Sequence, residues 1–417
     1  MVAVLKGLLL DTLGSSLAAS TLGDCCAQVA AVVRSDPGAP EATLLGYGDR
    51  VSVLQAAFAN GALAHALNFD ALGGAGGHIG VAAVVAPLAM AERKGSVGGR
   101  EFLAAMAIAA EFTARLAGAL SAAAVDANEK FLEGQLLSYL GAAAAAGRIL
   151  RFTPERMHST LGLALMQSAG TRQVSFEGGA AKAIYGGFAN HGAILATLLA
   201  EQDVDARCDV LEGRAGIYGL FYDGKHEVAV LQGLGERFYA ADTVFKPWPV
   251  SGILHPYIET CLALRRPGMT VKSVHVTLTP EGRPWVEPPE ERRRPQNAAT
   301  AANSLFFAVT KTLVNGALTL ADFTPQGLAQ PALPMNYSVD ERPAIEITLQ
   351  SGEVLKAPVS RESRPMSYGA LAAKFRDCAQ HSVRPIPSAV VSELIERIAN
   401  LDTVEDVSIL PALLRGS

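Results

Sequence analysis

The sequence predicts a mainly α protein in which a large all-helical domain is accompanied by a smaller α+β domain. Hydrophobic residues make up 50% of the 417 residues and charged residues only 18%, so the chain has a large core to bury. Alanine-rich runs fill roughly the first 200 residues, whereas apolar and polar residues begin to alternate after about residue 265. Alanine-rich runs are typical of packed helices, and alternation of apolar and polar residues is typical of half-buried strands.

The first part of the chain contains a series of alanine-rich segments that favour helix. They are VLQAAFANGALAHAL (53–67), REFLAAMAIAAEFTARLAGAL (100–120), LGAAAAAGRIL (140–150) and ANHGAILATLLAEQ (189–202). Because small side chains let helices approach closely, we expect these helices to pack on several sides in a bundle. Residues 1–20 predict an amphipathic helix, since Lys6 and Asp11 interrupt the apolar run, and Thr153 followed by Pro154 marks a further helix start.

The segment LNFDALGGAGGHIG (67–80) interrupts this helical texture with five glycines. Glycine is less favourable than alanine in a helix by about 1 kcal/mol, so the backbone is expected to leave helical geometry between Leu72 and His78. Two interpretations remain open at this point. The segment is either a connector with an incidental histidine, or a loop that presents Asp70 and His78 for function.

The second part mixes strands and helices. Val274, Val276 and Leu278 alternate with polar residues, and residues 344–359 alternate around a Ser351–Gly352 turn, which predicts a strand and a hairpin. Helices are predicted over 297–318, 367–379 and 388–401. We therefore expect three segments, namely a helical domain over 1–245, an α+β domain over 246–368, and a helical C-terminal segment over 369–417 that returns to or flanks the helical domain.

Composition and motifs exclude several function classes. The net charge of −5 argues against a nucleic-acid partner. The sequence has no GxGxxG after a strand, no GxxxxGK[ST], no GxSxG and no zinc-type spacing of His and Cys, so no metal is predicted. Five scattered cysteines suggest free thiols and a cytoplasmic protein. The apolar run 79–91 is too short to span a bilayer, so no membrane association is expected.

The chain resembles the MmgE/PrpD family, which includes 2-methylcitrate dehydratase, cis-aconitate decarboxylase and iminodisuccinate epimerase. No single motif carries the likeness; an ordered series of segments does. These are LLLDTLGSSLAAS (8–20), AAFANGALAHALNFDALGGAGGHIGVAAVVAPLAMAERKG (56–95), LMQSAGTRQVSFEGGAAKAIYGGFANHGAILATLLAEQ (165–202), FKPWPVSGILHPYIETCLAL (245–264) and AANSLFFAVTKTLVNG (301–316).

The resemblance implies a helical domain with an α/β lid domain and a cleft between them. It also implies a homodimer, a small-molecule substrate, no metal or organic cofactor, and acid–base chemistry next to a carboxylate. By hand alignment, His78, Lys182 and Lys246 stand where the family keeps a histidine and two lysines. A lysine that meets a substrate carboxylate contributes about 1.5–3 kcal/mol.

We predict Asp70, His78 and Lys182 as catalytic residues. For each, a structural role is the alternative: Asp70 capping a helix, His78 bonded to backbone, and Lys182 on the surface. Lys246 alternatively caps or extends along apolar surface, and His255 alternatively caps the next helix. His65 and His191 are interpreted as core or interface histidines and are not included in the site.

The chain departs from the family pattern at several positions. Leu132 stands in place of a histidine, Ser251 where decarboxylases have a histidine, and Phe307 in place of a tyrosine. Asn68 replaces an aspartate, Leu72 a polar residue and Tyr185 a histidine. The predicted substrate-binding residues are Asn68, Leu72, Leu132, Tyr185, Lys246, Ser251, His255 and Phe307.

Since losing one general acid or base costs about 10²–10⁴ in rate, the ancestral reactions are not expected here. The sequence predicts a cofactor-independent lyase or isomerase whose substrate is bulkier and less anionic than citrate-type acids, such as an intermediate of specialised metabolism. Two alternatives remain open. One is a cyclase whose apolar cleft folds a biosynthetic intermediate, and the other is a non-catalytic paralogue that binds a ligand or partner.

Overall fold

The structure, a computed structural model, describes residues 1–74, 77–121, 130–222, 224, 232–330, 332–360 and 365–415. It is mainly α-helical with a small mixed sheet, as the sequence predicts. The chain divides into two compact units. The first, which we call the helical unit, comprises residues 1–66, 70–245 and 366–417, and the second, the α/β unit, comprises residues 67–69 and 246–365.

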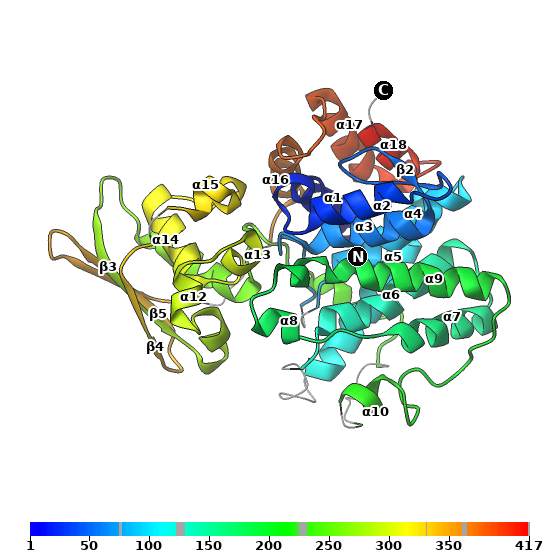
Figure 1. Cartoon of the computed structure of the whole chain (residues 1–417), viewed down its shortest axis with the longest axis horizontal. Coiled ribbons are helices and arrows are strands. Elements are labelled where there is room, and N and C mark those ends of the chain that lie inside the picture. The colour runs from blue at the N-terminus through cyan, green and yellow to red at the C-terminus, as the bar shows by residue number, and fades with distance from the viewer. Residues whose placement is uncertain are drawn as a thin grey trace. The chain divides into compact units, whose positions relative to one another are not determined.

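The helical unit contains most of the helices of the described chain (Figure 1). Its main helices are α1 (Val2–Leu22), α2 (Cys26–Ser35), α3 (Val53–His65), α4 (Ile79–Lys94), α5 (Gly99–Ser121), α6 (Glu133–Ile149), α7 (Pro154–Gln167), α8 (Gln173–Phe176), α9 (Tyr185–Glu201), α10 (Ile217–Phe221), α16 (Tyr368–Gln380), α17 (Ser388–Ala399) and α18 (Ile409–Arg415). The short strands β1 (Ala42–Thr43) and β2 (Arg50–Val51) pair antiparallel. The predicted cap of α7 is confirmed, because the Thr153 side chain accepts a hydrogen bond from the Arg156 N–H.

Helices α3 and α9 cross at a pair of glycines, and this crossing positions the candidate site. A Cβ built on Gly61 would lie 2.4 Å from the carbonyl oxygen of Gly186, and one built on Gly186 would lie 2.4 Å from that of Gly61. Only glycine permits the two backbones to come so close. The C-terminal end of α3 therefore lies against the first turn of α9.

Helix α1 corrects a sequence prediction. Residues 1–20 were expected to form an amphipathic helix, but Leu5 and every residue from Gly7 to Ser20 are buried. The reason is tertiary: α1 packs against α3, α4, α16 and α17, so it has no broad solvent-facing side. Its polar residue Asp11 is buried with an ion-pair partner, Lys374 of α16, at 2.6 Å.

The α/β unit contains α11 (His255–Leu264), α12 (Pro289–Arg293), α13 (Ala298–Ala301), α14 (Leu305–Asn315), α15 (Pro325–Leu328) and a four-stranded sheet. The sheet order is β4 (Met335–Val339), β3 (Val271–Leu278), β5 (Ala344–Leu349) and β6 (Val354–Pro358). Strands β3 and β4 are parallel, whereas β3–β5 and β5–β6 are antiparallel.

One face of this sheet packs on the helices. Val274, Val276 and Leu278 are buried, together with Ile345 and Ile347 of β5, in a core shared with α11 and α14. The predicted strand and the β5–β6 hairpin are confirmed. Strand β4 was not predicted, since its burial depends on pairing with the distant strand β3.

The predicted helix over 297–318 is interrupted. Its first turn is α13, and the chain leaves helical geometry before Ser304, whose side chain accepts from the Phe307 N–H and caps α14. A serine at a helix N-cap is worth about 1 kcal/mol, which explains why the helix restarts there.

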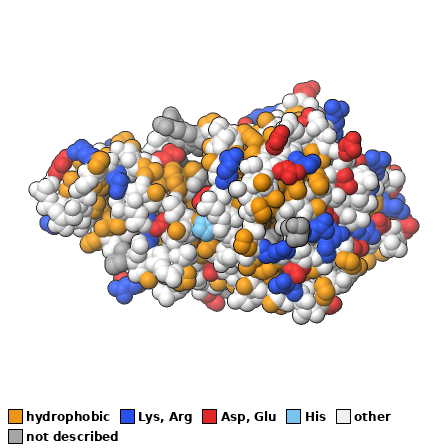
Figure 2. Space-filling view, turned by 90° about the horizontal axis from the view of Figure 1, so that it is seen from above, with side chains coloured by type: hydrophobic (Ala, Val, Ile, Leu, Met, Phe, Trp, Pro, Cys, Tyr) orange, Lys and Arg blue, Asp and Glu red, His pale blue; other side chains and the backbone are white. Residues whose placement is uncertain are grey.

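Three helical segments of the described chain are long and apolar enough to span a membrane by length and composition: Val2–Leu22, Gly99–Leu120 and Ala180–Glu201. Their most apolar windows are 78%, 67% and 67% buried inside the protein. On the face shown in Figure 2, basic and acidic side chains occur side by side.

Candidate functional site

The glycine-rich segment forms a loop between α3 and α4, and the predicted departure from helical geometry is confirmed. Leu72 and Val244 pair through two backbone hydrogen bonds of 2.9 and 2.8 Å. The Ala71 N–H donates to Oδ2 of Asp11 at 3.0 Å, and the Gly73 N–H donates to the carbonyl of Gly77. Ala75 and Gly76, in the middle of the loop, lie outside the described residues. The loop is thus held directly after Asp70.

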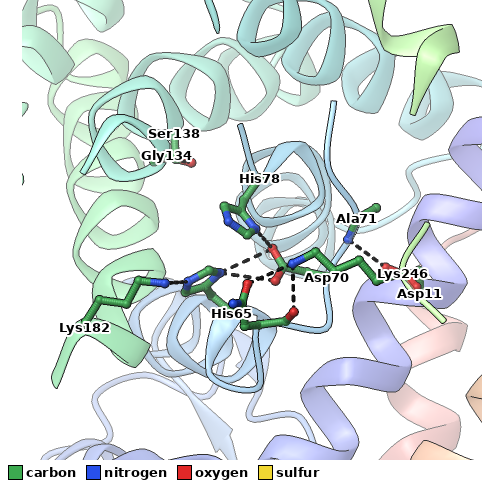
Figure 3. Close-up of polar contacts among 10 residues, drawn as sticks. Asp11, His65, Asp70, Ala71, His78, Gly134, Ser138, Lys182 and Lys246 are labelled. Atoms are coloured by element: carbon green, nitrogen blue, oxygen red, sulfur yellow. Dashed lines mark hydrogen bonds and ion pairs between the residues drawn. The ribbon is translucent and has the colours of Figure 1, made fainter. Parts of the chain in front are cut away.

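Asp70 is the centre of the candidate site (Figure 3). Its carboxylate is fully buried and accepts hydrogen bonds from Nδ1 of His78 at 2.7 Å and from Nδ1 of His65 at 3.2 Å. Burial by itself would raise the pKa of Asp70, but the two imidazoles outweigh it and hold this pKa well below its usual range. The site therefore contains a buried carboxylate at neutral pH.

His65 links this carboxylate to Lys182. Its Nε2 lies 3.1 Å from Nζ of Lys182, which belongs to the 3₁₀ turn Ala180–Ile184 before α9. Burial, and then the nearby ammonium of Lys182, lower the pKa of His65 well below its usual value, so His65 is neutral. The hydrogen bonds assign its tautomer: Nδ1–H donates to Asp70, and Nε2 accepts from Lys182.

Lys182 is an ammonium at neutral pH, but it loses its proton at a lower pH than an exposed lysine does. Burial lowers its pKa to about 8, although Asp70 opposes that change. The order Lys182–His65–Asp70–His78 forms a continuous chain of polar contacts from the turn before α9 to the start of α4.

Tyr185, the first residue of α9, packs on this chain. Its ring centroid lies 4.2 Å from that of His65 and 6.3 Å from that of His78. Burial, and then Asp70, raise the pKa of Tyr185 well above its ordinary value, so its hydroxyl keeps its proton. Leu132, also predicted, is the half-buried N-cap residue of α6, and its N–H donates to the carbonyl of Gly170.

The predicted site residues are divided between the two units. Asp70, His78, Lys182 and Tyr185 come together in the helical unit, which also contains Leu72 and Leu132. The residues in the α/β unit are Asn68, Lys246, Ser251, His255 and Phe307. That the two groups of residues act on the same substrate remains a prediction.

Within the α/β unit, Lys246 and Asn68 form a buried pair. Lys246 is 2% exposed, and its Nζ donates to both the carbonyl oxygen and Oδ1 of Asn68, each at 2.8 Å. His255, for which a cap of the next helix was the alternative, is the first residue of α11, and the N-cap residue of that helix is Leu254. Its Nε2 lies 3.3 Å from the carbonyl oxygen of Val250. Phe307 is 5% exposed and packs edge-on against Phe323 in the core, with ring centroids 5.2 Å apart.

Sequence reasoning missed His65, which was interpreted as a core or interface histidine. It is buried, at 1% exposure, but it contacts two candidate catalytic groups rather than backbone. Its place at the last turn of a helix, five residues before Asp70, was the available signal. That signal is weak, because the loop path that returns Asp70 to His65 is set by contacts with α1 and Val244.

The same cluster has the ligand types of a metal site. One atom each from His65, Asp70 and His78 lies within 4.8 Å of the others. Imidazole nitrogens and a carboxylate suit zinc and related divalent ions. These atoms also satisfy one another as hydrogen-bonded groups, so the arrangement is complete as an acid–base cluster.

Comparison with known proteins identifies a protein family to which this chain is similar. A family model for the MmgE/PrpD N-terminal domain matches residues 1–228. Cis-aconitate decarboxylase from Homo sapiens is 24% identical, over 99% of this chain and 89% of the human protein. The cis-aconitate decarboxylase of Aspergillus terreus is 26% identical over 69% of this chain and 62% of that protein.

A third relative, the cis-aconitate decarboxylase-like protein oryM of Aspergillus oryzae, is 25% identical over 90% of this chain and 85% of that protein. The family model covers more than half of the chain and includes the whole His65–Asp70–His78–Lys182 cluster. The chain belongs to the MmgE/PrpD family.

Proposed function

We propose that this protein is a lyase that works by acid–base chemistry next to a carboxylate or carbonyl group and uses no cofactor. An isomerase that shares the same proton-abstraction step is included in the proposal. The observation that carries it is the buried Asp70 carboxylate, which accepts hydrogen bonds from two imidazoles. A lysine is hydrogen-bonded to one of these imidazoles. Relatives named cis-aconitate decarboxylase support the lyase class.

In this proposal His78 exchanges the proton with the substrate. Its Nδ1–H donates to Asp70, so the acceptor for a substrate proton is Nε2, on the opposite side of the ring. Asp70 fixes the ring orientation and stabilises the imidazolium that forms, as a carboxylate does beside a catalytic histidine. Lys182 supplies positive charge for a substrate carboxylate.

The proposed substrate carries at least one carboxylate but is less anionic than a tricarboxylate. Leu72 and Leu132 are half-buried apolar side chains where the family resemblance implies polar ones. Apolar lining favours a bulkier organic acid of the kind found in specialised metabolism. We do not propose cis-aconitate itself as the substrate, because the histidine equivalents at Leu132 and Ser251 are absent.

The test is proton exchange in D₂O, followed by NMR across a panel of unsaturated, hydroxylated and β-keto mono- and dicarboxylic acids. Abstraction of a proton next to a carbonyl or carboxylate incorporates deuterium, whatever the direction of the overall reaction. We expect exchange to persist after treatment with a metal chelator and to fall by about 10²–10⁴ in His78→Ala. The matched control is His158→Ala, since His158 is an exposed histidine of α7.

Full exchange in both His78→Ala and Lys182→Ala contradicts this mechanism. Loss of exchange on chelation, restored by zinc, contradicts the cofactor-free part of the proposal. Ligand-induced thermal stabilisation without exchange for any acid in the panel favours the non-catalytic alternative.

A further inference from the structure

The geometry points to an oxyanion site at the first turn of α6, formed by the N–H groups of Glu133 and Gly134 and by the hydroxyl of Tyr185. We infer that it binds a carboxylate of the substrate beside His78. This inference rests on the proposed function, because it assigns a place to the acid group of the same substrate.

The first turn of α6 has unused donors. The Leu132 N–H donates to the carbonyl of Gly170 at 2.8 Å, and the N–H groups of Gln135 and Leu136 donate to the carbonyl of Leu132. Among the described residues, the N–H groups of Glu133 and Gly134 have no acceptor. No side chain caps this helix of 17 residues, so the positive end of its dipole is not neutralised by a capping group.

Tyr185 provides a second and independent observation. Its side chain is 3% exposed, and its hydroxyl is buried without a hydrogen-bond partner in the described chain. Leaving a buried hydroxyl unpaired is costly, so such a group requires a physical explanation. A ligand oxygen at the turn would give this hydroxyl its missing acceptor.

Gly134 shows that this hydroxyl is directed at the helix turn. A Cβ built on Gly134 would lie 2.6 Å from the Tyr185 hydroxyl oxygen and 3.5 Å from Cδ2 of His78. Any side chain at position 134 would therefore obstruct the space between the tyrosine and the turn. The same residue is adjacent to both the proposed anion donors and the proposed catalytic imidazole.

The electrostatics of the turn are compatible with an anion. Tyr185 stays protonated and can only be a donor toward an anionic oxygen, because burial raises its pKa well above the ordinary value. Burial also raises the pKa of Glu133 to about 7, so this carboxyl is largely uncharged below neutral pH and repels an anion little. Backbone N–H groups at a helix N-terminus are a common carboxylate site.

The experiment measures malonate binding to the full chain by isothermal titration calorimetry at about pH 6, where the Glu133 carboxyl, with its pKa of about 7, is mostly uncharged. Tyr185→Phe removes the hydroxyl, and we expect malonate to bind about ten- to hundredfold more weakly, as for the loss of a hydrogen bond to a charged group. Gly134→Ala fills the turn with a methyl group and should weaken malonate to a similar extent. Tyr139→Phe is the matched control, because Tyr139 is another buried tyrosine and lies on the same helix α6.

The inference is overturned if the unchanged chain does not bind malonate. It is also overturned if Tyr185→Phe and Gly134→Ala bind malonate as tightly as the unchanged chain does. If proton exchange by His78 persists alongside that result, the proposed function stands and only the anion site is wrong. If malonate binding depends on Tyr185 while no acid undergoes exchange, the anion site stands and the catalytic proposal is wrong. Circular dichroism of each variant verifies the fold, and the two separate substitutions keep the test decisive should one of them not fold.

Discussion

At the scale of single residues, the charge of the cluster is decided by its hydrogen bonds. Asp70 is fully buried, yet it is a carboxylate, because two imidazole N–H groups donate the hydrogen bonds that water would otherwise donate. His65 is neutral because burial, and then the adjacent Lys182 ammonium, lower its pKa well below the usual value. A buried carboxylate at Asp70 and a cation at Lys182 can thus coexist at neutral pH.

Lys182 leads to a prediction of pH dependence. Burial lowers its pKa to about 8, so it is an ammonium below that pH and a neutral amine above it. If the ammonium binds the substrate carboxylate, kcat/KM should be constant just below pH 8 and fall about tenfold per pH unit above it. Steady-state kinetics across pH 6 to 10 (an approximate range) check this expectation.

Lys182→Arg is the informative comparison, because a guanidinium keeps its charge throughout this pH range. Its activity should be lower overall, but the decline above pH 8 should disappear. A decline that is unchanged in Lys182→Arg would assign the titration to another group.

At the scale of elements, the site loop is held by a buried ion pair from helices distant in sequence. Oδ1 of Asp11 in α1 lies 2.6 Å from Nζ of Lys374 in α16, and Oδ2 of Asp11 accepts the N–H of Ala71. Asp11 and Lys374 are 363 positions apart in the chain. The C-terminal part of the sequence therefore contributes to the position of Asp70 without contacting it directly.

Lys374→Met should destabilise the protein by about 3–5 kcal/mol, since it leaves the Asp11 carboxylate buried without its cation. Urea denaturation followed by circular dichroism measures the change. The double variant Asp11→Asn with Lys374→Met should recover part of this loss, because it removes the unpaired charge while an amide oxygen can still accept from Ala71. Equal stability of the single variant and the unchanged chain would show that the pair does not anchor the loop.

At the scale of the whole molecule, the apolar composition is used for packing between helices. Three helical segments have the length and hydropathy of membrane spans, but most of each is buried inside the protein. The cytoplasmic location and the homodimer remain predictions based on composition and on the family resemblance. Several large apolar side chains of the helical unit are exposed, including Met166 at 80%, Phe176 at 58% and Phe188 at 48%, which is compatible with a further partner surface.

We expect the purified protein to remain in aqueous buffer without detergent and to be a homodimer. Light scattering coupled to gel filtration should give a mass of about 87 kDa, twice the chain mass of 43.5 kDa. A mass near that of one chain contradicts the dimer, and a requirement for detergent contradicts the prediction that the chain does not associate with membranes.

The sequence by itself determined the helical class, the strand pattern around Val276, the β5–β6 hairpin and the break in the helix before His78. These features depend on local propensity and on the period of apolar residues, which act over a few neighbouring positions. Family resemblance added Asp70, His78 and Lys182 as candidate site residues.

Only the tertiary structure decided the environment of these residues. It placed His65 between Asp70 and Lys182, buried α1 on nearly all sides, and paired β4 with a strand about 60 residues earlier. Each of these outcomes depends on contacts between segments far apart in the chain, such as the glycine crossing of α3 and α9. Local patterns cannot specify such contacts, because the burial that changes a pKa or a strand's stability comes from a partner element that the pattern does not contain.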